Sequence, residues 1–392
     1  MQRIAELERQ YVMDALNNEF ATSLNSIYNN KLEHDFAAMY HAKYAIGHCN
    51  GTATLHTALG ALGIGPGDEV ICPALTMSST SIPVVLAGAV PVFADSDKDT
   101  FEISADSIEK VITPRTKAII TVSLYGLAPD YDRILDLCKK HHIALIEDNA
   151  ECFLGKYKGK LVGEFGDFAS FSFQASKHLT TGEGGVLICN DEELADKARR
   201  FNCLGYAGVS AKQGKITRND IQDPNYSRHI SIGFNYRMSE LQAACACAQL
   251  ERAEELVQQR IEVAKIFEEA LKGQDLLIPQ VTPEGYENSF WTYCVILNTE
   301  HPETDWYRFR DAFQKNGGDG YYAAWKLSYN EPAYQTIVQN MPGVWQKFDA
   351  NLCPNAEYLQ KRMIQLKTNY WDLEEAKQQA AILRKTVDEF TK

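Results

Sequence analysis

The strongest constraint on the fold is a regular alternation of short apolar runs and amphipathic segments between residues 44 and 148. Short apolar runs predict buried strands, and apolar residues at three- and four-residue spacing predict helices. The expected strands are 44–47, 69–73, 91–94, 118–124 and 143–147, and the expected helices are 53–62, 79–86, 104–112 and 131–140. Such alternation is typical of an α/β fold whose mostly parallel sheet is covered by helices on both faces.

Ligands of such sheets bind beyond the carboxyl ends of the strands, so the residues that follow each strand are the candidates for chemistry. After the aromatic run 168–173, the stretch SFQASKHLTTGEGG places Lys177 at the end of a buried strand. A desolvated lysine suits a Schiff base with a carbonyl, because burial disfavours its charged form. A lysine on a solvated turn is an equally good interpretation of this stretch alone.

Two other strand ends carry polar groups. The segment IALIEDNAE runs from an apolar strand into Asp148, which needs a partner if it is buried. The junction NGTA at Thr52 joins a strand to a helix, where free backbone N–H groups and the helix dipole favour a phosphate. Taken alone, Asp148 fits a loop or capping aspartate as well, and Thr52 fits an ordinary helix N-cap better.

Together the three positions describe one ligand. A phosphate cradle near Thr52, a carboxylate at Asp148 and an amine at Lys177 match a ring that carries a phosphate, a basic nitrogen and an aldehyde. Pyridoxal 5'-phosphate (PLP) has these features, and it needs a lysine and an acidic partner for its ring nitrogen. The sequence therefore predicts a PLP site.

The second half of the chain predicts a smaller α/β domain. A polar, turn-rich segment, 205–233, could cover the site and supply basic groups, or it could be a solvated loop. A long helix that opens near Ser239 leads to a strand at 290–297, a helix at 306–316 and a final helix at 373–390. The expected division is a helical lead-in (1–40), a large PLP-binding domain (41–255) and a small C-terminal domain (256–392).

Composition narrows the function classes. The chain has 392 residues with 39 basic and 52 acidic side chains, a formal charge of −13, which argues against binding to nucleic acid or to anionic membrane. The N-terminus lacks an apolar signal core, and no apolar run reaches a membrane span. The ten cysteines include no C-x-x-C pair, so we expect reduced thiols, no metal site and a cytoplasmic protein.

From Lys43 to Lys367 the chain resembles the DegT-type sugar aminotransferases of PLP fold type I. The similarity lies in NGTATLHTALGALGIGPGDEV, PALT, GAVPVFAD, TPRTKAII, IEDNAE, GEFGDFASFSF, SKHLTTGEGG and GFNYRMSELQAA. The resemblance implies that Lys177 binds the cofactor covalently and also transfers protons, and that Asp148 pairs with the ring nitrogen. The other implied cofactor contacts are Thr52, Ala53 and Ser172 at the phosphate, Met77 at the ring face, and Asn235 at the phosphate of the neighbouring subunit of a homodimer.

The resemblance also implies that L-glutamate donates the amino group and that a keto- or aldehydo-sugar accepts it, in making surface polysaccharide or lipopolysaccharide. Arg237 is a candidate for holding a substrate carboxylate, because arginine pairs with carboxylates in a bidentate manner.

Two departures from the family pattern are visible. Glu151 stands where the family commonly has Gln or His near the phenolic oxygen of the cofactor, which predicts an altered protonation there. The stretch GDGYYAAWKLSYNEPAY, with candidate substrate residues Tyr321, Tyr322 and Trp325, replaces a histidine-tyrosine-proline pattern of nucleotide-sugar members. This stretch resembles that of aminotransferases acting on a free acidic sugar, a resemblance that implies 3,8-dideoxy-8-oxo-octulosonate as a candidate substrate, with a nucleotide-linked keto-sugar as the alternative.

Short sequence features argue against two alternative functions. A sugar 3-dehydratase of this fold has histidine in place of Lys177, and a dinucleotide-dependent dehydrogenase would need a G-x-G-x-x-G after the first strand, which is missing. A non-catalytic PLP-binding sensor remains an alternative at this stage.

Overall fold

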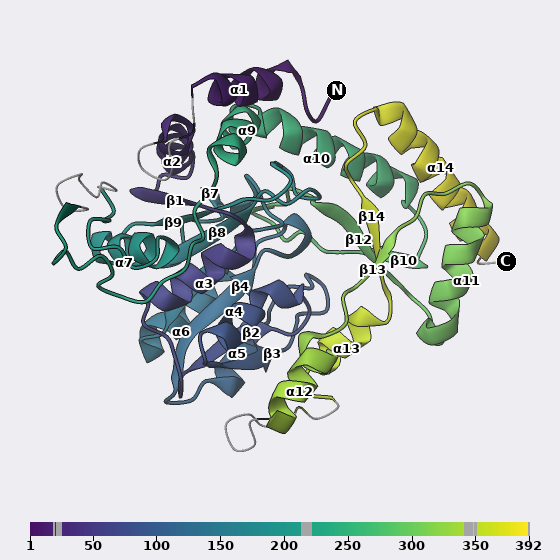
Figure 1. The fold of residues 1–392 in the computed structure, drawn as a ribbon. Coiled ribbons are helices and arrows are strands. Elements are labelled where there is room, and N and C mark those ends of the chain that lie inside the picture. Colours follow the sequence, from purple (N-terminus) through teal and green to yellow (C-terminus); the bar gives the residue numbers. More distant parts are fainter. Residues whose placement is uncertain (19, 21–25, 213–221, 341–347, 349–350, 391–392) are drawn as a thin grey trace.

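The computed structural model describes residues 1–18, 20, 26–212, 222–340, 348 and 351–390, and within them a seven-stranded sheet forms the centre of the molecule (Figure 1). Its strand order is β1-β9-β8-β5-β4-β2-β3. The strands are β1 (Tyr44–His48), β2 (Glu69–Pro73), β3 (Val90–Ala94), β4 (Thr116–Val122), β5 (Ala144–Asp148), β8 (Phe168–Ser172) and β9 (Gly185–Cys189). Only β9 runs antiparallel to its neighbours in this sheet. The expected mostly parallel sheet is confirmed.

Both faces of the sheet are buried because successive residues of a strand point to opposite sides. Ile120 joins the core formed with Leu55 of α3, whereas Ile119 joins the core formed with Ile134 of α6. On the first face lie α3 (Gly51–Ala61), α4 (Ile82–Leu86) and α7 (Glu192–Asn202). On the second lie α2 (Ile27–Met39), α5 (Ala105–Val111), α6 (Tyr131–His141) and α9 (Glu240–Glu251).

Three expected elements differ from the observed ones. The helix expected at 79–86 is a 3₁₀ turn, η2 (Ser78–Thr80), followed by α4, because Pro83 cannot donate a backbone hydrogen bond to a continuous helix. The strand expected at 118–124 ends at Val122, and Tyr125 takes a left-handed φ of 62°. The long helix is broken at Arg252, where α9 ends and α10 (Ala253–Ala270) begins.

A second, antiparallel sheet lies on the right of Figure 1, in the order β10-β12-β14-β13. Its strands are β10 (Leu277–Pro279), β12 (Thr292–Leu297), β13 (Tyr322–Ala323) and β14 (Met363–Lys367), and its helices are α10, α11 (Pro302–Lys315) and α14 (Leu373–Phe390). A small three-stranded sheet joins β6 (Lys156–Tyr157), β7 (Lys160–Leu161) and β11 (Tyr286–Glu287).

The remaining helices tie the parts together. α1 (Glu6–Asn17) and α2 pack against α9. α12 (Pro332–Asn340) and α13 (Pro354–Gln360) contribute to the core that also holds Phe93 of the large sheet. The C-terminal third of the chain therefore contributes to two cores, and the expected boundary at residue 256 stays a prediction.

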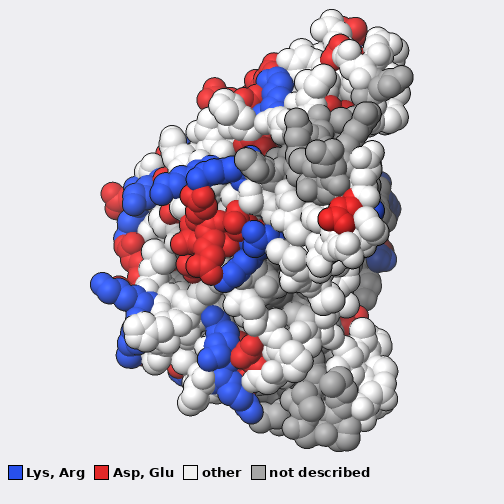
Figure 2. All heavy atoms as spheres, turned by 60° about the vertical axis from the view of Figure 1, so that its left-hand side comes forward, with Lys and Arg blue, Asp and Glu red and all other residues white. Residues whose placement is uncertain are grey.

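Among the described residues, none of the helices is long and apolar enough to cross a membrane. The same residues contain no group of three or more His, Cys, Asp or Glu side chains that could hold a metal ion. On the face seen in Figure 2, acidic side chains are flanked by basic ones. All ten cysteines are free thiols.

Candidate active site

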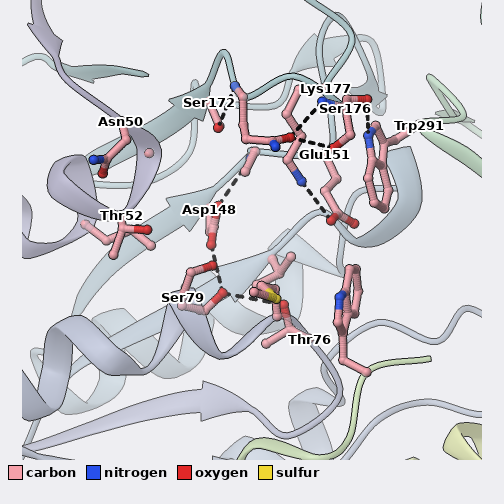
Figure 3. Close-up of a pocket in the computed structure, with 18 of the residues that line it drawn as sticks. Asn50, Thr52, Thr76, Ser79, Asp148, Glu151, Ser172, Ser176, Lys177 and Trp291 are labelled. Carbon is pink, nitrogen blue, oxygen red and sulfur yellow. Dashed lines mark hydrogen bonds and ion pairs between the residues drawn. The ribbon is translucent and has the colours of Figure 1, made fainter. Parts of the chain in front are cut away.

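A pocket of about 920 Å³ opens at the carboxyl ends of the parallel strands (Figure 3). The β1–α3 junction, the end of β5 and the turn after β8 form one side of it, with Thr52, Asp148 and Lys177. Residues of the second sheet and its loops, among them Trp291 and Trp325, form the other. The structure thus brings together the three positions on which the predicted PLP site rests, although they lie far apart in the chain.

Lys177 lies in the turn after β8, with its backbone N–H donating to the carbonyl of Gln174. Its side chain is 14% exposed, and Nζ donates to Oε1 of Glu151 at 3.0 Å. Nζ also lies 4.2 Å from the centre of the Trp291 ring. The lysine is therefore a largely buried amine between a carboxylate and an aromatic face, and not a solvated turn residue.

Asp148 ends β5 and points into the pocket (Figure 3). Its carboxylate accepts hydrogen bonds from Oγ1 of Thr80 at 2.9 Å and from the N–H of Ala150 at 3.2 Å. Burial raises the pKa of this carboxyl, while these two bonds and the charge of Lys177 act in the opposite direction. A protonated ring nitrogen would stabilise the charged form, so this position fits the acidic partner that PLP needs.

The phosphate end of the pocket lies at the start of α3. Asn50, and not Thr52, caps this helix, because Oδ1 of Asn50 accepts from the N–H of Ala53 at 2.8 Å. Thr52 and Ser172 line the pocket beside this cap. A Cβ on Gly51 would lie 2.9 Å from Cβ of Ser172, so glycine is needed for this close approach. A helix N-terminus flanked by two hydroxyls fits a phosphate.

Glu151 is the acidic centre next to the lysine. Its Oε2 accepts from the N–H of Tyr125 at 3.2 Å, while Oε1 faces Lys177. Burial raises the pKa of Glu151, and the charge and hydrogen bond of Lys177 lower it in part. The carboxyl of Glu151 therefore faces the lysine amine and is held by the backbone at Tyr125, which has a strained, left-handed φ of 62°. This arrangement suits a group that affects the protonation of the lysine amine.

The candidate substrate residues separate into two groups. Tyr322 and Trp325 line the pocket. Tyr321 does not line it: its ring is 9% exposed and packs on Trp306, because neighbouring residues of an extended segment point to opposite sides. Arg237 is not among the residues that line this pocket, and its guanidinium donates to the sulfur of Cys203 at 3.4 Å.

The cofactor candidates show a similar division. Ala53 and Met77 line the pocket, and the Met77 side chain is half exposed there. Asn235 forms a backbone bridge with Cys203 and does not belong to the lining of this subunit's pocket.

Sequence reasoning missed Trp291 and Thr80, which line the pocket, and Arg260, which does not line it but contacts the lysine turn. Trp291 precedes β12, and only its place beside Lys177 reveals it. Thr80 lies in a polar run that carries no signal. Arg260 did carry one, because it interrupts the apolar stripe of α10, where Val257 and Ala264 are buried.

Trp291 and Trp325 form an aromatic wall of the pocket beside the lysine, and the fully buried ring of Tyr125 packs against both. Trp291 and Trp325 are near parallel at 13°, with centres 6.1 Å apart, and Tyr125 lies within 19° of both planes. Flat apolar faces of this kind suit the ring of a cofactor or the apolar face of a sugar.

The α/β fold and this set of groups define a class: a PLP-dependent enzyme of fold type I. A family model described as the DegT/DnrJ/EryC1/StrS aminotransferase family matches residues 2–383. The chain belongs to this aminotransferase family.

Individual relatives support this family assignment. A GDP-perosamine synthase of Escherichia coli O157:H7 is 39% identical over 294 residues, which cover 74% of this chain and 75% of that protein. The structure of an aminotransferase from Psychrobacter cryohalolentis is similar with a TM-score of 0.88 and 27% identity, covering 99% of this chain and 98% of that one. A second similar structure is the PMP form of Spr1654 from Streptococcus pneumoniae, named "putative sugar aminotransferase". Its TM-score is 0.85 at 25% identity, and the similarity covers 99% of this chain and 98% of that one. PLP is accordingly the cofactor, and the residues present fit it.

Proposed function

We propose that this aminotransferase moves the amino group of L-glutamate onto the carbonyl carbon of a sugar. The observation that carries this proposal is the amine of Lys177 beside Glu151, in a pocket that also contains Asp148 and an aromatic wall. The pocket, about 920 Å³, has room for a substrate beside a cofactor. The product would serve the synthesis of surface polysaccharide or lipopolysaccharide in the cytoplasm.

Bound PLP supplies an aldehyde that accepts amines and a ring that withdraws electrons. Lys177 would bind this aldehyde and, once displaced by the donor, would move a proton between the substrate carbon and the cofactor. Asp148, oriented by Thr80, would keep a proton on the ring nitrogen. Glu151 would accept a hydrogen bond from the displaced lysine, as it does in this structure, and so hold it in place.

The nature of the sugar is a finer question. A relative named GDP-perosamine synthase supports a nucleotide-linked acceptor. We therefore propose a nucleotide-linked keto-sugar before the octulosonate.

A homodimer with shared sites is part of the proposal. Large apolar side chains are exposed beside the pocket, including Met77 and Leu86, which is 60% exposed. Ile232 is 87% exposed on the segment that leads to Asn235. Burial of such side chains favours association, and Asn235, which lies outside its own pocket, is free to serve the site of a partner.

The test is amino transfer measured with purified, PLP-loaded enzyme. L-Glutamate should bleach the yellow colour of the lysine-bound cofactor, and Lys177→Ala should show neither colour nor transfer. Nucleotide-linked and free keto- and aldehydo-sugars are then compared as acceptors. Turnover only with the free octulosonate would reject the nucleotide-linked substrate, and a protein that binds PLP but never transfers an amino group would reject the enzymatic proposal in favour of a sensor.

A further inference from the structure

Side chains from distant segments hold the backbone around Lys177, in addition to the bond from its own N–H to the carbonyl of Gln174. The carbonyl groups of Ala175, Ser176 and Lys177 accept hydrogen bonds from the side chains of three residues distant in sequence. Arg3 donates to the carbonyls of Ala175 and Lys177, each at 2.5 Å. These bonds fix the turn that carries the amine, independently of the ring contacts made by the amine itself.

Arg260 on α10 makes the central contacts. Its Nη2 donates to the carbonyls of Ser176 and Lys177, both at 3.0 Å. Its Nη1 donates to the carbonyl of Trp291 at 2.8 Å and to Oγ1 of Thr368 at 3.3 Å. One guanidinium therefore holds the lysine turn and the tryptophan that faces the lysine amine.

Trp291 closes the network. Its indole N–H donates to the carbonyl of Ser176 at 2.9 Å, and its ring lies 4.2 Å from Nζ of Lys177. Arg260, Trp291 and the turn are thus linked in a closed ring of hydrogen bonds. A shift of any one of them would move the amine relative to Glu151.

The charge on Arg260 is unusual for a merely structural residue. The side chain is 1% exposed, and none of the described carboxylates lies within ion-pair distance of it. Burial and the nearby charge of Arg3 lower the pKa of Arg260 to about 9. A buried cation held only by carbonyl and hydroxyl oxygens is costly, so a packing role alone would be met better by an apolar side chain.

We propose that Arg260, assisted by Arg3, is a positioning residue that fixes the turn bearing the reactive lysine and keeps its amine aligned between Glu151 and Trp291. The planar fork of arginine suits this role, because it can bond two carbonyls on one side and a third on the other. The proposal concerns the aminotransferase reaction of the family and does not depend on which sugar is the acceptor.

The decisive comparison is Arg260→Met against Arg199→Met. Arg199 is the matched control, since it is also buried, donates to Glu33 and the carbonyl of Ala45, and does not contact the lysine turn. In cofactor-free protein, hydrogen exchange of the peptide spanning 174–181 should accelerate about tenfold in Arg260→Met and stay unchanged in Arg199→Met. This readout needs neither PLP nor a substrate, so its failure is separable from failure of the proposed amino donor.

The loaded enzyme provides the second readout. The maximal rate at which L-glutamate bleaches the cofactor should fall about 10- to 100-fold in Arg260→Met, because a small displacement of a reacting group is costly. The glutamate concentration at half-maximal rate should change less than about threefold, and Arg260→Lys should recover part of the rate.

Unchanged exchange at 174–181 together with an unchanged maximal rate in folded Arg260→Met would overturn the proposal. Equal exchange changes in Arg260→Met and Arg199→Met would also overturn it, since both would then report general loss of stability. If Arg260→Met does not fold, Arg3→Ala decides: faster exchange of the same peptide supports the proposal, and wild-type exchange with a wild-type rate refutes it.

Discussion

Glu102 offers the clearest pH-dependent test of how the site is buried. Its side chain is 3% exposed; Oε1 accepts from the N–H of Leu124 at 3.1 Å, and Oε2 has no hydrogen-bond partner among the residues that the structure describes. Burial raises the pKa of Glu102 well above 4.5, and the charges of Glu151 and Asp97 raise it further. The folded protein therefore keeps this proton at a pH where the unfolded chain has lost it. Glu102→Gln removes the titration and keeps the shape.

Proton linkage gives the sign and the size of the change in unfolding free energy with pH. A carboxyl whose folded pKa is raised contributes its full stability below the unfolded pKa and loses it as pH rises toward the folded pKa. The loss is about 1.4 kcal/mol per pH unit. Between pH 5 and pH 7, the unfolding free energy of wild type should thus fall relative to that of Glu102→Gln, with about 3 kcal/mol as the upper limit for one proton.

The assay is urea unfolding of cofactor-free wild type and variant at pH 5, 6 and 7. Glu8→Gln is the control of opposite sign: burial raises the pKa of Glu8, but hydrogen bonds from Ala5 and Gln249 and the contact with Arg252 lower it overall. Glu8→Gln should cost the same stability at all three pH values, because that contribution is lost only as pH falls. Parallel curves for Glu102→Gln and wild type would refute the reasoning.

Three further variants test the site. Glu151→Gln removes the carboxylate 3.0 Å from the lysine amine, so the midpoint of the spectral pH titration of the loaded enzyme should move to lower pH; an unchanged titration contradicts this role. Asp148→Asn removes a charged hydrogen-bond acceptor for the ring nitrogen and should slow bleaching by L-glutamate about 10- to 100-fold, with an unaltered rate as the contrary result. Trp325→Ala should raise the acceptor KM about 2- to 12-fold and leave the glutamate half-reaction unchanged; equal losses in both half-reactions would show that the ring does not serve the acceptor.

Most of the large sheet could be predicted because its signal is local. The expected strand at 69–73 coincides with β2, and the expected final helix at 373–390 coincides with α14. In both, the apolar period is uninterrupted, so the pattern identifies the element and its ends. Where a backbone restriction intervened, as at Pro83 and Tyr125, the same pattern placed the boundary wrongly.

The residues of the candidate site also differ in whether the sequence alone could predict their place. Lys177 and Asp148 could be placed at the pocket from the sequence because Asp148 ends β5 and Lys177 lies in the turn that follows β8, and the carboxyl ends of parallel strands meet at one edge. Tyr321 was misplaced because adjacent tyrosines in an extended segment face opposite sides, and the pattern of the loop did not tell which faced inward. The Arg218 and Lys215 positions of the expected covering loop lie outside the described residues.

The order of residues along the chain thus predicts the fold class, the cofactor and a candidate lysine for it, because strand periodicity and strand ends are properties of neighbouring residues. The surroundings of that lysine depend on contacts between segments far apart in sequence. Arg260 is 83 residues from Lys177, and Trp291 is 115 from Ser176. Their partners are backbone carbonyls, which every residue has, so no sequence pattern can specify which carbonyl a distant side chain will meet.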